Sequence, residues 1–70
     1  MSIRYFVSTD SENRPLALYR FDIAIHDERC WNGSEWVYTE KPTRWLILHE
    51  GWLEDISEAN ARTLFPKAFE

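Results

Sequence analysis

The sequence has little of several things that common classes of small protein need. It has one cysteine, Cys30, so an internal disulfide cannot form. Its two glycines, Gly33 and Gly51, are too few for the glycine-rich loops that cradle nucleotide phosphates. The longest apolar run, residues 45–48, falls far short of the ~18 residues of a membrane span. These absences exclude a disulfide-stapled secreted miniprotein, a P-loop or dinucleotide-binding protein and a membrane-spanning protein.

Basic residues are also scarce. Eight Lys and Arg stand against twelve Asp and Glu, which gives a net charge of −4, opposite to the basic footprint of most nucleic-acid binders. The charges are scattered and form no acidic tail. Residues 1–10 lack the basic-then-apolar pattern of a signal peptide. Together with the lone cysteine, this pattern predicts a cytoplasmic protein.

What the sequence does have is a composition that can fold. With 70 residues, of which 44% are hydrophobic and 29% charged, it fits one globular domain spanning residues 1–70. Aromatic residues make up 16%, and large side chains are what a small core needs to bury enough apolar surface. We therefore expect most of the aromatic residues to serve the core, and a minority to be free to contact a partner.

The first half of the chain is typical of antiparallel strands. Residues 3–9 alternate between two faces, and a polar cluster at residues 10–15 predicts a turn after them. Asn32-Gly33 indicates a two-residue type I′ hairpin turn, in which Trp31 would face Ser34 and Arg29 would face Trp36. The resulting sheet would bury one apolar face and leave a mixed, mostly polar face in water.

Two local conformations stay open in this interpretation. A strand running unbroken from Leu16 to Trp31 would be too long, so we expect a break between Asp22 and Glu28. If the break shifts the phase by one residue, Tyr19 and Phe21 move to the opposite face from the hairpin side chains. Residues 44–50 fit a helix capped by Thr43 and closed by Gly51, but they fit a strand equally well.

The C-terminal segment predicts a short helix. Ser57 is a favourable N-cap, Glu58 places negative charge at the positive helix end, and Pro66 ends the helix. The predicted fold class is α+β: a small antiparallel sheet of about four strands with this helix, and a second short helix as the alternative at residues 44–50, packed on one face.

No catalytic or metal-binding set emerges from the spacing. The metal-ligating residue types are spread without a paired motif such as C-x-x-C or H-x-x-x-H. Cys30 and His26 are too far apart along a strand for a nucleophile and its base. We expect no enzyme activity, no metal and no cofactor. The residues considered for a metal were His26, Asp27, Glu28, Cys30, His49 and Glu50.

Two binding functions remain. Arg4, Phe6 and Arg20 combine cations with an aromatic ring on neighbouring strands, as single-stranded nucleic-acid binders do. This is the alternative hypothesis. Trp45, Trp52 and Leu53, with Arg44 beside them, are the residues that the sheet register explains least, and they have the composition of a protein interface.

Self-association is a further alternative. We expect Ile3–Thr9 to form an edge strand, and an edge strand can pair with a second copy of the chain or with a partner. A homodimer of purely structural role would also relieve the small core.

One recurring pattern spans most of the chain. Arg4-Tyr5-Phe6, Leu18-Tyr19-Arg20, the hairpin around Trp31-Asn32-Gly33, Gly51 and the segment at residues 55–61 follow one another in an order that resembles short proteins of actinobacteria and their phages, for which no function is known. The resemblance implies a bacterial or phage-encoded cytoplasmic protein and adds no catalytic residue. Small phage proteins often bind a host protein, so the leading hypothesis is a non-enzymatic intracellular protein-binding module, such as an inhibitor or adaptor.

Overall fold

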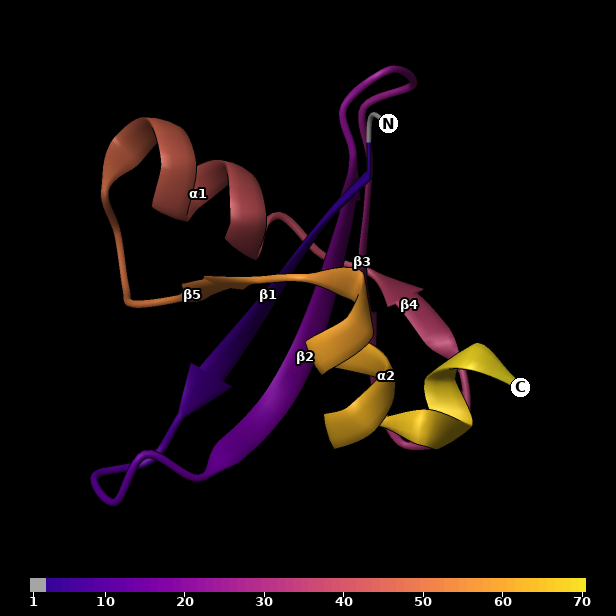
Figure 1. Ribbon diagram of the computed structural model, residues 1–70. Helices are drawn as coiled ribbons and strands as arrows, with labels where there is room; N and C mark the ends of the chain where they lie inside the picture. Colours follow the sequence, from indigo (N-terminus) through magenta and orange to yellow (C-terminus); the bar gives the residue numbers. More distant parts are fainter. Residues whose placement is uncertain (1–2) are drawn as a thin grey trace.

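Five antiparallel strands form one sheet in the order β4-β3-β2-β1-β5, with a helix on each side of it (Figure 1). The computed structural model describes residues 3–70. The α+β class is confirmed, with one strand more than the four expected. The elements in chain order are β1 (Ile3–Thr9), β2 (Pro15–Asp22), β3 (Asp27–Trp31), β4 (Trp36–Tyr38), α1 (Lys41–Leu48), β5 (Glu54–Ile56), α2 (Glu58–Leu64) and the 3₁₀ helix η1 (Pro66–Phe69).

Strand β1 lies inside the sheet, which corrects the expectation that it forms an edge. It pairs with β2 on one side and with β5 on the other, where Tyr5 lies opposite Ile56. The edge positions belong to β4 and β5, which have three residues each. Short edge strands offer few unpaired backbone groups to another chain. The structure therefore weakens the argument for pairing through β1.

The turn between β1 and β2 is built around Asp10, as the polar cluster predicts. Its carboxylate accepts the backbone amides of Glu12 at 2.8 Å and Arg14 at 2.9 Å. These hydrogen bonds, the one to Arg14 above all, lower the pKa of Asp10 below its ordinary value. Asn13 takes the positive φ of 63° that the reversal requires.

The expected break between β2 and β3 occurs at residues 23–26, where His26 adopts a positive φ of 52°. Across the break Tyr19 lies opposite Cys30, and Phe21 lies opposite Glu28. Tyr19 and Phe21 therefore point to the opposite face from Trp31. The sequence left open whether the break shifts the alternation of side chains by one residue, and in the structure it does.

The predicted type I′ turn at Asn32-Gly33 is wrong. The connection spans residues 32–35, and Trp31 pairs with Trp36 rather than with Ser34. Gly33 has a positive φ of 101°, but Asn32 instead uses its side-chain oxygen to accept the amides of Ser34 and Glu35. The register moves by two residues, so each side chain keeps its predicted face.

Other elements cover both faces of the sheet, whereas the sequence predicts that only one face is buried. On one face Tyr5, Val7 and Leu18 pack under α2 and η1 through Ala61 and the half-buried aromatic residues around it. On the other face lie Phe6, Tyr19, Phe21 and Leu53, packed against α1. Figure 1 shows α1 and α2 on opposite sides of the strands. The register between β1 and β2 puts Phe6, Tyr19 and Phe21 on this face, and the phase shift at residues 23–26 puts Trp31 on the other.

Residues 44–50 are largely helical, and α1 begins at Lys41, earlier than the predicted cap at Thr43. Glu28 on β3, almost fully buried, accepts the amide of Thr43 at 2.7 Å through Oε1. A carboxylate from a neighbouring strand thus replaces the missing side-chain cap and meets the positive end of the helix. The helix ends where His49 turns left-handed and the Glu50 amide donates to the Arg44 carbonyl.

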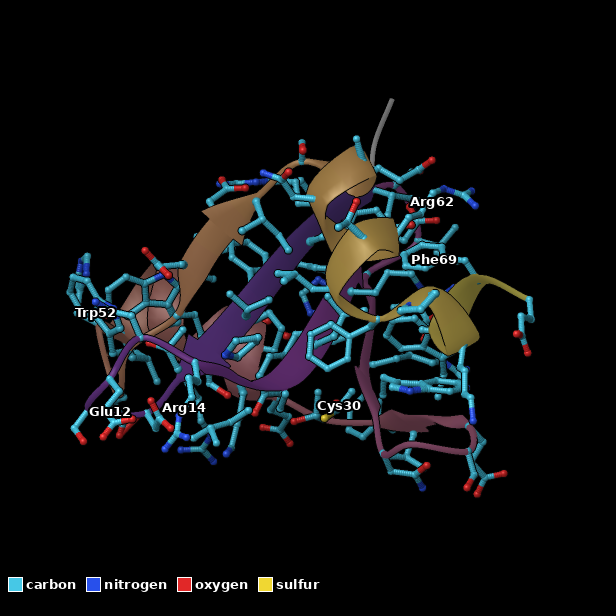
Figure 2. All side chains as sticks on the ribbon, turned by 60° about the horizontal axis from the view of Figure 1, so that its bottom comes forward. Glu12, Arg14, Cys30, Trp52, Arg62 and Phe69 are labelled. Atoms are coloured by element: carbon cyan, nitrogen blue, oxygen red, sulfur yellow. The ribbon has the colours of Figure 1, made fainter. Side chains whose placement is uncertain are left out.

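Helix α2 follows the prediction closely. Ser57 Oγ accepts the amide of Asn60 at 3.1 Å, and Pro66 follows the last helical turn. The chain then continues as η1, which brings Phe69 against Tyr5 and Trp36 with ring centroids 5.5 and 6.4 Å apart. Arg62 lies over the same ring, and Figure 2 shows the two side by side. The C-terminal segment closes the first core face.

Candidate functional site

The structure brings two of the predicted interface residues into direct contact. Trp45 is half-buried on α1, and Trp52 lies in the segment between α1 and β5, with its ring edge-on to Trp45 at a centroid distance of 5.0 Å. The Trp52 side chain is 69% exposed, more than any other tryptophan. Trp52 is therefore available to a partner, and Trp45 supports it from behind.

The other two predicted residues have different roles. Leu53 is only 6% exposed and packs against Phe6, Tyr19 and Phe21, so it anchors the segment after α1 instead of forming an exposed contact. Arg44 is exposed and pairs with Glu50 at 3.4 Å and with Glu40 at 3.9 Å. These ion pairs hold the Arg44 side chain along the helix.

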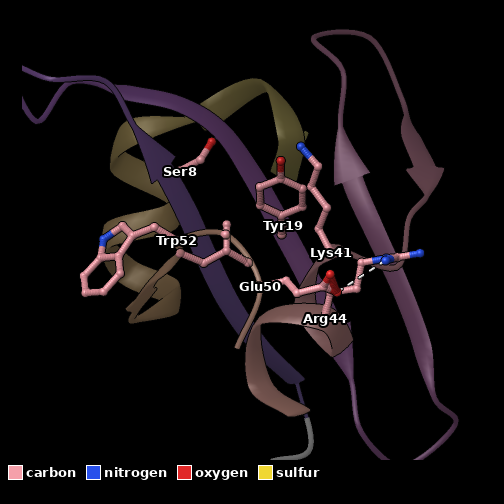
Figure 3. A pocket seen from close by; sticks show the side chains of 8 residues that line it. Ser8, Tyr19, Lys41, Arg44, Glu50 and Trp52 are labelled. Carbon is pink, nitrogen blue, oxygen red and sulfur yellow. Dashed lines mark hydrogen bonds and ion pairs between the residues drawn. The ribbon is translucent and has the colours of Figure 1, made fainter. Parts of the chain in front are cut away.

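A pocket of about 260 Å³ opens beside the tryptophan pair. Trp52 lies on one side of it and Lys41 and Arg44 on the other, with the buried Tyr19 ring between them (Figure 3). The lining comes from β1, β2, α1 and the segment before β5, and it consists of Ser8, Tyr19, Lys41, Arg44, Glu50, Gly51, Trp52 and Leu53.

One end of the pocket is polar and holds the Lys41 amine and the Tyr19 hydroxyl, and the Arg44–Glu50 ion pair lies below this end in the view of Figure 3. The Lys41 side chain runs alongside Tyr19, with its Nζ 5.9 Å from the ring centroid, and the Lys41 amine and the Tyr19 hydroxyl point the same way (Figure 3). Within residues 3–70, Lys41 has no ion-pair partner, whereas Arg44 is paired with Glu50. The lining therefore carries one uncompensated positive charge in a protein of net charge −4.

Cys30 lies on the same sheet face as Tyr19, next to this polar end. Burial raises the pKa of the Cys30 thiol, while the charge of Lys41 and a hydrogen bond from Tyr19 lower it by less. The net direction is upward, so the thiol is protonated near neutral pH. A nucleophilic cysteine needs the opposite shift. Cys30 acts as a small packing residue of the core cluster around Tyr19 and Phe21.

The three residues of the nucleic-acid alternative do not form one surface. Phe6 is fully buried and cannot stack on a base. Arg4 lies over the Phe6 ring at 5.1 Å and pairs with Asp55 of β5. Arg20 is on the opposite face, with its guanidinium 4.7 Å from the Trp36 ring centroid. The predicted arrangement is wrong because the register places Arg20 opposite Tyr5, so that its side chain points to the other face from Phe6.

The candidate metal ligands are also dispersed. Nowhere in residues 3–70 do three His, Cys, Asp or Glu side chains come close enough to hold a metal ion. Glu28 is used at the start of α1, and His26 lies 3.7 Å from its second oxygen. The expectation of no metal and no catalysis stays a prediction.

Sequence reasoning missed Ser8, Tyr19 and Lys41 as members of a site. Ser8 and Tyr19 were assigned to a strand and to the apolar face, and Lys41 was assigned to a strand end. Tyr19 shares a sheet face with Ser8 through the register between β1 and β2, and Lys41 reaches the pocket because the helix starts early. The one signal in the sequence was the unexplained pair of tryptophans.

Comparison with known proteins adds no relative: the chain matches no protein-family model, no curated protein and no solved structure. The resemblance to actinobacterial and phage proteins therefore stays a prediction. Among the residues that the structure describes, no helix has the length and apolar character needed to cross a membrane.

Proposed function

We propose that this protein is a small, non-enzymatic protein-binding module whose binding surface is centred on Trp52. The observation that carries the proposal is the 69% exposed indole of Trp52 beside a pocket. Leaving so large an apolar ring in water forgoes the stabilisation that its burial would give. Tryptophan is also among the residues that contribute most to binding at protein interfaces.

The surroundings of Trp52 support this assignment. The Trp52 ring packs against Trp45, so its side chain has little conformational entropy to lose on binding. Arg44 and Glu50 lie on the far side of the pocket and supply the polar rim that interfaces have. A module of this kind acts by occupying a surface of its partner, as inhibitors and adaptors do. The lone cysteine fits work in the reducing cytoplasm.

Selection from a library of random linear peptides displayed on phage tests the proposal. The selected peptides are measured against the wild-type protein, Trp52→Ala and Ile25→Ala. Ile25 is the matched control because it is 70% exposed, lies on the β2–β3 loop and does not line the pocket. We expect Trp52→Ala to weaken binding about tenfold or more, and Ile25→Ala to leave it unchanged.

Thermal unfolding of each variant shows whether it is folded. Trp52 and Ile25 are both exposed, so neither substitution should cost much stability. Peptides that bind the folded Trp52→Ala variant as well as the wild type would overturn the proposal, as would a failure to select any peptide that depends on Trp52.

A further inference from the structure

The pocket beside Trp52 is chemically two-sided. One side offers the exposed Trp52 ring and Leu53, and the other offers the Lys41 amine, next to the Tyr19 hydroxyl (Figure 3). Building on the proposed function, we infer that the pocket receives one apolar or aromatic side chain of a partner peptide segment, and that an acidic residue next to it places its carboxylate on Lys41. The ligand class is an acidic peptide with an apolar anchor.

Charge determines the acidic part of this ligand. Arg44 is already paired with Glu40 and Glu50, so Lys41 is the only lining cation without an ion pair within residues 3–70. One carboxylate neutralises it. A basic segment would be repelled by Lys41. A chain of phosphates would bring several negative charges close to the Glu50 carboxylate, and Lys41 could neutralise only one of them.

Geometry agrees with a carboxylate. An ammonium group donates up to three hydrogen bonds, while an ionised carboxylate only accepts. The single hydrogen of the Tyr19 hydroxyl is already donated to the Cys30 thiol, so Lys41 is the donor that a ligand carboxylate meets at this end of the pocket. The Lys41 amine and the Tyr19 hydroxyl point the same way in Figure 3, and Ser8 lies on the other side of the Tyr19 ring, above Trp52 in the view. The oxygens of one carboxylate can accept charge-assisted hydrogen bonds from the Lys41 ammonium group.

Size determines the apolar part. The pocket holds about 260 Å³, which is below the ~300 Å³ at which pockets for whole drug-sized ligands begin. It suits one inserted side chain. An aromatic ring in it can meet the Trp52 indole edge-to-face, as the Trp45 ring already does from behind.

A probe series that needs no known partner tests the inference. The ¹⁵N-labelled protein is titrated with 3-phenylpropionate, with the uncharged 3-phenylpropionamide and with 3-phenylpropylamine, and amide shifts are followed by NMR. We expect 3-phenylpropionate to bind in the millimolar range, with shifts at Tyr19, Lys41 and Trp52, and to bind about three- to fivefold more tightly than the amide. The amine should bind most weakly.

Two substitutions at one position locate the charge. In Lys41→Met the preference for the acid over the amide should disappear, while Lys41→Arg should keep it. Lys41 is exposed, so both variants should fold. Equal binding of acid and amide by the wild-type protein, or an acid preference that survives in Lys41→Met, would overturn the inference.

The Trp52-dependent peptides described above separate this inference from the proposed function. They should be enriched in Asp or Glu next to an aromatic or large aliphatic residue, and changing that acid to its amide should weaken binding to the wild type but not to Lys41→Met. Trp52-dependent peptides without such an acid would overturn the inference and leave the proposed function standing. The absence of Trp52-dependent peptides would overturn both.

Discussion

At the scale of single residues, the character of the pocket depends on the neighbours that each side chain meets. Tyr19 is a core residue by burial, yet its hydroxyl reaches the polar end of the pocket next to Lys41. Arg44 and Lys41 are both exposed cations on α1, but the ion pair to Glu50 leaves only Lys41 free for a ligand. The identity of the neighbours, more than the residue type, decides which side chain can bind.

The thiol of Cys30 reports on this arrangement. Because burial outweighs the opposing effects of Lys41 and Tyr19, its pKa is raised, and alkylation by iodoacetamide should reach its half-maximal rate above the pH found for the same protein unfolded in urea. Lys41 favours the thiolate, so Lys41→Met should move this midpoint to still higher pH. Lys41→Arg, which keeps the charge, should leave the midpoint near that of the wild type. A wild-type midpoint at or below that of the unfolded protein would contradict the prediction.

At the scale of elements, α1 is positioned by a contact from outside its own sequence. Its N-cap residue, Glu40, makes no side-chain cap, and the buried Glu28 carboxylate of β3 accepts the Thr43 amide instead. Helix α2 in contrast uses the ordinary local cap, Ser57. One helix is therefore capped by its own neighbouring residue, and the other by a strand residue fifteen positions away from the amide that it accepts.

Replacing Glu28 should show this difference. Glu28→Ala leaves the amide of the half-buried Thr43 without its acceptor and should lower the free energy of unfolding by about 2 kcal/mol in urea denaturation. Glu28→Gln keeps an acceptor oxygen and should cost less. Ser57→Ala, at an exposed cap, serves as the reference and should cost about 1 kcal/mol. A loss from Glu28→Ala no larger than that from Ser57→Ala would argue against the capping role.

At the scale of the whole molecule, the two faces of the sheet have separate tasks. The face under α2 and η1 is closed by the C-terminal Phe69, while the face under α1 carries the pocket and Trp52. Figure 2 shows Phe69 and Trp52 at opposite ends of the molecule. Substitutions at these ends should therefore separate stability from binding.

Phe69→Ala should lower stability without changing the binding surface. The ring is half-buried against Tyr5, Trp36 and Arg62, so its removal should cost about 2 kcal/mol, below the range for fully buried Phe. Phe69→Leu should recover part of the loss. Under conditions where it is folded, Phe69→Ala should bind the Trp52-dependent peptides as the wild type does. Weaker binding by the folded variant would mean that the two faces are coupled.

The sequence by itself determined the features that depend on near neighbours. The alternation at residues 3–9, the Asp10 turn, the Ser57 cap and the stop at Pro66 each follow from side chains within a few positions of one another. The α+β class follows from them, because strand and helix periods differ. The tryptophan pair was also visible, as residues that the sheet left unexplained.

Only the tertiary structure decided which face each strand residue occupies and which residues form the pocket. Because side chains alternate along a strand, the turn at residues 23–26 leaves Tyr19 and Phe21 on the opposite face from Trp31, and the position of β5 places β1 inside the sheet. The early start of α1 depends on Glu28 from β3. These outcomes depend on contacts between segments that are distant in the sequence. Such contacts form only as the chain folds, so local sequence patterns cannot show which of the alternative arrangements has the lowest free energy.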